Sequence, residues 1–320
     1  RQGGDPMTGR IFTADHHVYD LPQPLAWTVT HTGSVPCDSY SMTVLYEADM
    51  APVLRLAAGF AAIEAGQTVL RGIVDEYTVD LDEDGLRATI MGRGYAARLL
   101  DNESRPVTYQ SATLEEIIRC HVTPYGITCD AVAPVWANSV YTVASGSSQW
   151  KALDNFCRTY GGFSPRFARD GKLLAVPETQ TRRLAVGEGA PVLSCSFREN
   201  HYGVLTEVLV IDKTRGVSYS VENPDMIQKG GQCRRVVYTP GQSTWAAMRY
   251  TGEYQIEQSR QDESEVTICL PGSFLAFPGD RLDLDLPRLG LNGTFRVAEA
   301  ENDFSQDRGA VVTLKAKELE

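Results

Sequence analysis

The sequence lacks a long apolar run. No stretch approaches the roughly 18 consecutive apolar residues that a membrane-spanning helix requires. The first residues, RQGGDPMTGR, contain no apolar segment of the signal-peptide type. They also begin without Met, which predicts a trimmed N-terminus. We therefore expect a chain without a membrane span and without a secretory signal.

Basic residues are scarce relative to acids. The chain has 30 Lys and Arg against 41 Asp and Glu, a net charge of -11. No basic cluster is longer than the pair Arg234-Arg235. Nucleic-acid readers neutralise phosphates with clustered cations, so this composition argues against sequence-specific DNA or RNA binding. The acidity predicts solubility and a surface that repels polyanions.

Cysteine pairs are also absent. The seven cysteines form no C-x-x-C, and their number is odd. We interpret them as buried, reduced thiols of a protein made in a cytosol. Cys120 and His121 adjoin each other without a second ligand pair nearby, so no zinc site is predicted. We expect neither a metal nor a cofactor. The cysteines are Cys37, Cys120, Cys129, Cys157, Cys195, Cys233 and Cys269.

The sequence contains no G-x-S-x-G, H-E-x-x-H or P-loop pattern, and we predict no catalytic residues and no enzyme. Residues 92–97 fit G-x-G-x-x-A, but no buried parallel strand with an acid at its tip follows. We interpret them as a strand-to-helix turn. Asp15-His16-His17 predicts a solvated turn, because consecutive strand residues point to opposite faces and cannot easily share one metal.

At 320 residues and 42% apolar composition, the chain can hold two or three domains. The predicted fold class is α+β, mostly β, with two small tube-like β-barrel domains flanking a small α+β domain. The predicted boundaries are 1–100 for the first barrel and 101–185 for the α+β domain. The second barrel follows over 186–320, with a helical insertion around 244–260.

The first region shows the two-residue alternation of half-buried strands over 25–30 and 41–46. A longer strand is predicted over 67–81, with Gly72 able to bend it. Asp82-Glu83-Asp84-Gly85 predicts a hairpin turn, because glycine supplies a positive φ, and the next strand returns antiparallel. Short antiparallel strands with glycine turns indicate a small barrel or sandwich.

The middle region predicts two helices and a hairpin. A capping box over 113–116 opens the first helix, and Pro124 ends it. The second helix begins at 147–148, and Gly161 occupies the position of a left-handed C-cap. A hairpin with an Asp-Gly turn is predicted over 163–176. These elements indicate a small α+β domain.

The last region returns to strands. One helix is predicted over 244–260, with Trp245, Met248 and Tyr254 on its apolar side, although Gly252 lowers its helix propensity. The strands are predicted over 204–212, 265–270, 281–286, 294–301 and 310–317.

The segment Arg281-Leu282-Asp283-Leu284-Asp285-Leu286 alternates cleanly. Its leucines are expected to face a core, and its two aspartates to line the opposite surface. That surface is either an ordinary solvated face or the acidic wall of a channel along which a polyanion slides without sticking. The candidate channel-lining acids are Asp80, Asp82, Asp283 and Asp285.

Two alternatives concern the bacterial cell wall. Residues 141–150 resemble the opening of a LysM peptidoglycan-binding module, and residues 170–177 resemble its closing strand. The stretch between them predicts one helix where LysM has two. A cell-wall glycan hydrolase is the other alternative, but with 41 acids some carboxylate pair is always near, so that signal has almost no specificity.

The order of several short signatures resembles the baseplate-hub and tail proteins of Mu-like phages, prophages and related injection systems. The resemblance extends from about Leu25 to Leu319. The signatures are the strand over 69–75, the Gly92–Gly94 turn into 99–101, the helix over 113–118 ending at 124–127, the helix and hairpin over 146–176, and the segments 278–280 and 289–293.

This resemblance implies a structural subunit of a virion tail, assembled in the bacterial host cytoplasm. It implies a homotrimer in which two barrels per chain alternate around a central channel. Such a ring would join tail tube proteins to a spike or tip protein, and DNA or cargo would pass without sequence-specific binding. The chain departs from larger members in having no appended lysozyme-like or spike segment, which predicts a simpler tail or a shortened C-terminus.

Overall fold

The computed structural model describes residues 7–33, 37–83, 85–178, 182–239, 243–260 and 263–318. The chain is mostly β, with shorter helical parts. It divides into two compact units. The first contains residues 1–184, 269–281 and 297–314, and the second contains residues 185–268, 282–296 and 315–320. No helix in the described ranges is long and apolar enough to cross a membrane.

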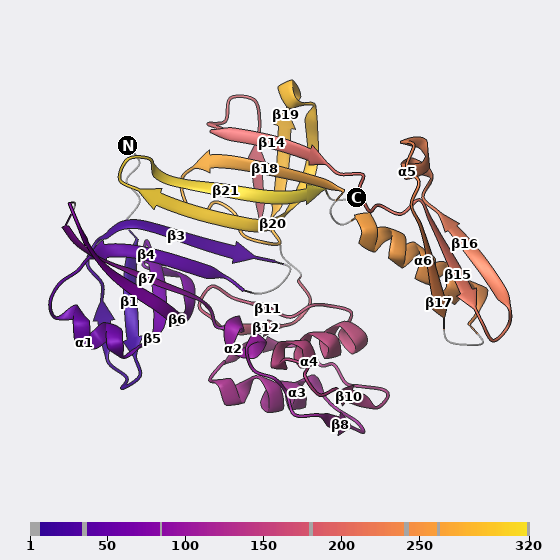
Figure 1. Cartoon of the computed structure of the whole chain (residues 1–320), viewed down its shortest axis with the longest axis horizontal. Helices are drawn as coiled ribbons and strands as arrows, with labels where there is room; N and C mark the ends of the chain where they lie inside the picture. Colours follow the sequence, from indigo (N-terminus) through magenta and orange to yellow (C-terminus); the bar gives the residue numbers. More distant parts are fainter. Residues whose placement is uncertain are drawn as a thin grey trace. The chain divides into compact units, whose positions relative to one another are not determined.

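A large antiparallel sheet dominates the first unit (Figure 1). From β20 onward its strands run in the order β20-β3-β4-β7-β6-β5-β1-β2. Among the described strands the pairing ends at β2 and closes no barrel, so the sheet is open where the sequence predicted a small closed barrel over residues 1–100. The strands are β1 (Thr8–Thr13), β2 (Val18–Asp20), β3 (Pro24–Thr32), β4 (Ser39–Leu45), β5 (Ala57–Glu64), β6 (Gln67–Asp82), β7 (Gly85–Gly94) and β20 (Leu291–Ser305).

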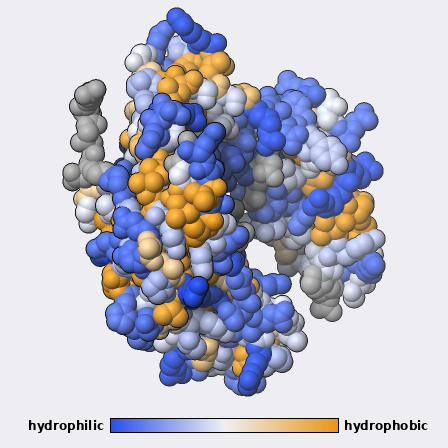
Figure 2. All heavy atoms as spheres, turned by 60° about the vertical axis from the view of Figure 1, so that its left-hand side comes forward, coloured by the Kyte–Doolittle hydropathy of each residue, from blue (hydrophilic) through white to orange (hydrophobic). Residues whose placement is uncertain are grey.

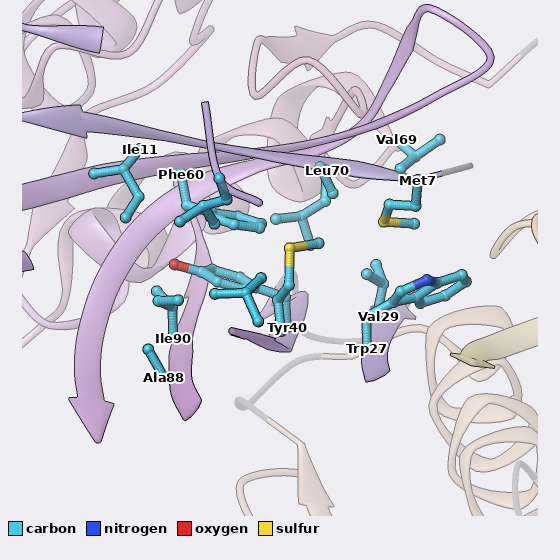
Figure 3. Close-up of a cluster of buried hydrophobic side chains, with 14 of the residues drawn as sticks. Met7, Ile11, Trp27, Val29, Tyr40, Phe60, Val69, Leu70, Ala88 and Ile90 are labelled. Carbon is cyan, nitrogen blue, oxygen red and sulfur yellow. The ribbon is translucent and has the colours of Figure 1, made fainter. Parts of the chain in front are cut away.

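The alternation read from the sequence places one face of this sheet on an apolar core. Tyr40 and Phe60 stack in that core with ring centroids 3.8 Å apart (Figure 3). The Tyr40 hydroxyl donates to the Ile73 carbonyl at 3.0 Å, so its one polar group is satisfied. The short helix α1 (Met50–Arg55) adds the buried side chains of Met50 and Leu54 to the same core.

The hairpin predicted after the long strand is confirmed, because Asp82 pairs with Gly85 and Gly85 has a φ of 109°. Asp84 lies outside the described residues. The register of β6 against β7 shifts between Val74 and Glu76, so the irregularity lies beyond Gly72. Gly72 serves a different purpose: a Cβ there would lie 2.1 Å from the Arg93 carbonyl oxygen.

A second apolar core forms between residues 99 and 175. The predicted N-cap at Thr113 is confirmed, since its side chain accepts from the Glu116 amide. The next helix is capped by Ser148. The elements are α2 (Ala96–Leu100), β8 (Val107–Tyr109), α3 (Leu114–His121), a 3₁₀ turn (Thr123–Tyr125), β9 (Cys129–Val132), β10 (Tyr141–Val143), α4 (Gln149–Phe156), β11 (Arg166–Phe167) and β12 (Leu173–Ala175).

The C-cap predicted at Gly161 is wrong by one residue. A five-residue π-turn, Cys157–Gly161, extends α4, and the left-handed position falls on Gly162 with a φ of 71°. The wider turn adds the one residue that the α-helical spacing did not allow for. Burial raises the pKa of Cys157 to about 12, so its thiol stays protonated at neutral pH.

The second unit contains a small lobe, residues 204–239 and 243–260, with its own core. Its three strands run in the order β16-β15-β17, with β17 parallel and β16 antiparallel to β15. Parts of β13 (Arg183–Val186), β18 (Ser264–Pro271), β19 (Arg281–Leu286), β20 and β21 (Gly309–Glu318) also belong to this unit, as does all of β14 (Ser194–Glu199). The lobe elements are β15 (Glu207–Asp212), β16 (Val217–Glu222), α5 (Pro224–Gln228), β17 (Arg234–Thr239) and α6 (Trp245–Arg260).

The helix predicted over 244–260 is confirmed as α6, and Met248 lies on its buried side as predicted, but the prediction is wrong for Trp245 and Tyr254. The buried stripe is Met248, Gly252 and Ile256, spaced four residues apart. Trp245 and Tyr254 are exposed. The prediction placed the large aromatic residues on the core side. A glycine can also belong to a buried stripe, where it lets the helix approach the sheet closely.

Candidate functional site

The two acids predicted in the first module lie on the β6–β7 hairpin. Asp80 and Asp82 are both exposed. The Thr78 hydroxyl donates to Asp80 at 3.1 Å, and Asp82 forms an ion pair with Arg87 across the hairpin. Asp80 pairs with Arg87, and Asp82 lies two residues further along β6. Both acids therefore lie on the same, polar face of the hairpin. This face is acidic, with one arginine set into it.

The other two acids lie on β19 with the alternation that the sequence predicted. Leu282 and Leu284 are buried, whereas Asp285 is exposed. Asp283 is half-buried and accepts a hydrogen bond from the Thr294 hydroxyl at 2.7 Å. Asp80 and Asp82 belong to the first unit and this pair to the second. The structure therefore describes two faces that carry these acids, each by itself, and Arg281 shares the face of Asp283 and Asp285.

The opposite face of the β6–β7 hairpin is apolar and uncovered, a feature that sequence reasoning missed. Leu81 pairs with Leu86, and Val79 with Ala88, so all four lie on one face. Ala88 is buried in the core, but Leu81 is 78% exposed. Apolar residues also reach the surface in patches on the side shown in Figure 2. The signal was present in the sequence, since the alternation continues through YTVDL to the turn.

An arginine clamp holds the turn between β7 and α2. Arg93 donates to both Asp75 oxygens, at 2.8 and 3.0 Å, and to both Asp101 oxygens, at 3.0 and 2.8 Å. These bonds lower the pKa of Asp101. A Cβ on Gly92 would lie 1.9 Å from the Ile73 carbonyl oxygen. The strand-to-helix reading of the G-x-G-x-x-A pattern is confirmed, because β7 ends at Gly94 and α2 begins at Ala96.

Tyr95 joins the first sheet to the α+β elements. Its hydroxyl accepts from Arg71 Nε at 3.1 Å, and the Arg98 guanidinium lies 4.6 Å from its ring centre. Gly171, in the turn before β12, packs so closely that a Cβ would lie 2.6 Å from the Tyr95 ring. Cation–π contacts and close packing restrict relative movement of the two modules here.

A small depression opens beside this joint. Its charged lining residues are Asp38, Arg71 and Arg169. Burial raises the pKa of Asp38 and lowers that of Arg169. The Arg169 guanidinium lies 3.4 Å from the centre of the Phe277 ring. That contact links the β11–β12 hairpin to the segment that returns late in the chain.

A buried amide is one of the groups that hold the returning segment. Phe274 has a φ of 51°, a strained value for a bulky residue, and its backbone N–H donates to Asn302 Oδ1 at 2.6 Å. Asn302 Nδ2 donates to the Val29 carbonyl at 3.4 Å. Asn302 is fully buried. The side chain thus connects β20 and β3 to residues 269–281. We call residues 269–281 the latch.

His31 lies inside the latch region. Its Nε2 donates to the Val69 carbonyl at 2.9 Å, whereas its Nδ1 has no hydrogen-bond partner among the described residues. The edge of the ring meets Phe274 and Phe277, with centroid distances of 6.1 and 5.1 Å. Burial lowers the pKa of His31, although nearby Asp38 opposes the shift. The imidazole is therefore a neutral part of the core.

Within the described ranges, no group of three or more His, Cys, Asp and Glu side chains could hold a metal ion. Asp15 and His17 lie 3.2 Å apart in an exposed turn, and a hydrogen bond from Thr13 is the largest of the effects that lower the pKa of Asp15. His16 has a φ of 68°, as a tight turn requires. The solvated-turn interpretation of this motif is confirmed.

The two strands that resembled a LysM module do not pair. β10 pairs with β8, whereas β12 pairs with β11 and β9 in another sheet. A module opened by the first strand and closed by the second would bring them into one sheet. The observed pairing gives no support to the peptidoglycan-binding alternative.

The fold is similar to that of solved phage and prophage tail proteins. The tail protein from Neisseria meningitidis MC58 matches with a TM-score of 0.75 and 16% identity, covering 98% of this chain and 97% of that one. The 43 kDa tail protein of prophage MuSo2 from Shewanella oneidensis matches with a TM-score of 0.77 and 14% identity, covering 97% and 98%.

A more distant match is the E. coli c3393 protein, a component of the type VI secretion system with structural similarity to the T4 tail proteins gp27 and gp5. Its TM-score is 0.57 at 11% identity, covering 93% of this chain and 74% of that one. No protein-family model and no curated protein matches the sequence. The predicted resemblance to tail proteins is thus confirmed at the level of fold, over nearly the whole chain.

Proposed function

We propose that this chain is a structural subunit of a phage tail or a related injection machine, acting at the hub between the tail tube and the spike or tip. The proposal rests on the similarity of fold to two tail proteins, which covers nearly the full length of this chain and of each of them. Fold alone does not determine function, so the surfaces of the chain must support the same role.

Two features of the surface suit a subunit of an assembly. The first sheet ends at the three-residue strand β2, with no further strand paired to it in the described part of the chain. The β6–β7 hairpin exposes an apolar face. Exposed sheet edges and contiguous apolar faces are costly for a solitary protein and ordinary in an interface. We infer a homotrimer in which two tube-like modules per chain alternate around a channel.

The proposed role is mechanical and not enzymatic. In it, the boundaries 1–100, 101–185 and 186–320 separate the first tube-like module, the α+β module and the second tube-like module. Asp80, Asp82, Asp283 and Asp285 would keep the channel wall negative, so that DNA or protein cargo passes without binding. The clamp of Arg93 and the joint at Tyr95 would hold the modules rigid while force is transmitted. Tail tube proteins and a spike or tip protein are the proposed neighbours, and the virion tail the proposed location.

The mass of the full-length protein in solution tests this proposal. Light scattering coupled to gel filtration should give three times the chain mass of 35.2 kDa, and negative-stain images of that fraction should show rings with a central opening. A protein that stays a monodisperse monomer across micromolar concentrations would overturn the trimeric hub. A trimer without a central opening would overturn the proposed channel and leave the proposed trimer intact.

A further inference from the structure

The small lobe has two layers, and each layer has an outer face that nothing in the described lobe covers. α6 lies along one face of the β16-β15-β17 sheet, where Met248 and Ile256 pack with Val208 and Val210 (Figure 1). This contact accounts for the inner faces of both layers. The outer face of the sheet and the outer face of the helix remain.

The outer face of the sheet is apolar at its centre. Leu209 pairs with Val236, and Ile211 with Tyr238, so these four side chains share one face. Leu209 and Ile211 are half-buried, whereas Val236 is 45% and Tyr238 56% exposed. Three strands about 4.8 Å apart and six residues long give a surface of about 14 by 20 Å. That surface fits one helix, which is about 10–12 Å wide with its side chains.

The outer face of α6 carries two tyrosines one turn apart. Tyr250 is 73% and Tyr254 54% exposed, and they lie opposite the buried stripe of the helix. Ala246 and Ala247, at the start of the same helix, are also exposed. Tyrosines are enriched at protein interfaces, because they bury a large rigid area at low entropic cost.

The two faces carry charges of both signs. On the sheet, the Lys213 ammonium lies 4.0 Å from the centre of the Tyr238 ring at one end of β15, and Glu207, Glu222 and Arg234 share the outer face at the other end. On the helix, Glu253 and Glu257 lie beside the tyrosines with Arg249, which leaves this stretch of α6 with an excess of acid. A helix laid on the sheet can place an acid near Lys213. Such matching favours one docking partner over others.

We propose that the outer face of α6 in one copy docks on the outer sheet face of the next copy. This rests on the proposed trimer, and it names the lobe as a second contact between subunits. Because the two faces are different surfaces of one lobe, the contact is heterologous, and the proposed trimer requires that it close into a ring after three copies. A footprint of about 280 Å² is well below the roughly 800 Å² per partner of a stable interface, so the contact supplements a larger one.

Cysteine cross-linking of the full chain tests the contact. Val236→Cys and Tyr254→Cys are combined in a background carrying Cys120→Ser, since Cys120 is an exposed native thiol. The two new thiols lie on opposite faces of the lobe, so a disulfide between them joins two copies. Mild oxidation should give covalent dimers and trimers on a non-reducing gel. The controls are each single variant and the pair Val236→Cys with Asp307→Cys, which uses an exposed turn outside the lobe.

The outcomes separate this contact from the hub proposal. Trimers by mass that cross-link no more than the controls would overturn the lobe contact and leave the hub intact. A monomeric protein would overturn both. As a second measurement, Tyr250→Ser with Tyr254→Ser changes only outward side chains, and should raise the concentration for half-assembly about ten-fold or more. Unchanged assembly of this variant would also overturn the contact.

Discussion

Asn302 is a single side chain that connects three separated segments. Replacing it with Ala leaves the Phe274 N–H buried without a partner and removes the group that holds its strained φ. An unsatisfied buried donor costs about 1–3 kcal/mol. We expect Asn302→Ala to lower the free energy of unfolding by that amount in urea titration.

Asn292→Ala serves as the matched control, because Asn292 lies on the same strand, β20, and is exposed. We expect it to change the free energy of unfolding by less than about 0.5 kcal/mol. Equal effects of the two variants would contradict the role assigned to the buried amide.

His31 predicts how stability depends on pH. Its pKa is lowered in the folded protein, so the unfolded chain binds more protons as the pH falls below the ordinary histidine value of about 6.5. Its contribution is therefore complete above that value and is lost as the pH falls, by up to about 1.4 kcal/mol per pH unit. The raised pKa of Asp38 lets the folded protein bind a proton more readily as the pH falls, which opposes this loss of stability. Arg169 lowers the pKa of His31 and therefore adds to the loss.

Urea midpoints at pH 7.5 and 5.5 measure this effect. His31→Asn removes the titrating group and keeps a donor near the Val69 carbonyl. We expect its midpoint to fall less between the two pH values than that of the wild type. His201→Asn, at an exposed histidine paired with Glu199, is the control and should follow the wild type. Parallel curves for wild type and His31→Asn would contradict the prediction.

At the scale of elements, Gly252 shows packing overriding helix propensity. Ala is normally favoured over Gly in a helix by about 1 kcal/mol. Here a Cβ would lie 2.4 Å from Val221 Cγ2 and 2.9 Å from Val221 Cβ, so α6 would have to move off its sheet. Overpacking of this kind costs about 1–3 kcal/mol. We expect Gly252→Ala to destabilise the lobe despite its better propensity.

Limited proteolysis of the lobe, followed by mass spectrometry, measures this. Gly252→Ala should be cleaved faster within residues 204–260 than the wild type. Gln258→Ala, on the exposed side of the same helix, should be cleaved at the wild-type rate. Slower cleavage of Gly252→Ala would mean that propensity outweighs packing at this position.

Elements with local signals could be predicted from the sequence. The caps at Thr113 and Ser148, the hairpin turn at Gly85 and the alternation of β19 each depend on neighbouring residues. Long-range pairing could not be predicted in this way. The pairing of β20 with β3 joins residues about 270 positions apart, and nothing local in either strand specifies its partner.

At the scale of the molecule, the four candidate acids test the channel. The variant Asp80→Lys, Asp82→Lys, Asp283→Lys, Asp285→Lys should retain duplex DNA in gel filtration at low salt, and lose it as salt rises, because added cations bind phosphates. The control, Glu115→Lys with Asp307→Lys, reverses two acids that are exposed elsewhere. DNA retention by the control, in proportion to its charge, would mean that the position of the acids is unimportant.

The surface was less predictable than the folded elements. Composition indicated an acidic chain, and alternation located Asp283 and Asp285 on the face opposite the core. The apolar row through Leu81 and Leu86 follows the same alternation. Sequence alone does not say where strands extend beyond the core and leave such a row exposed. The uncovered faces of the lobe were missed for the same reason. Burial depends on what lies opposite, which is a property of the tertiary fold.

The latch has a consequence for synthesis on the ribosome. The first sheet forms early, but Phe274, Phe277 and β20, which complete its core and its β3 edge, emerge some 250 residues later. At a translation rate of about 5–20 residues per second, Trp27 and the β3 edge wait about 12–50 s for their partners. Nascent chains stalled before residue 269 should therefore engage chaperones, and early termination should yield insoluble fragments.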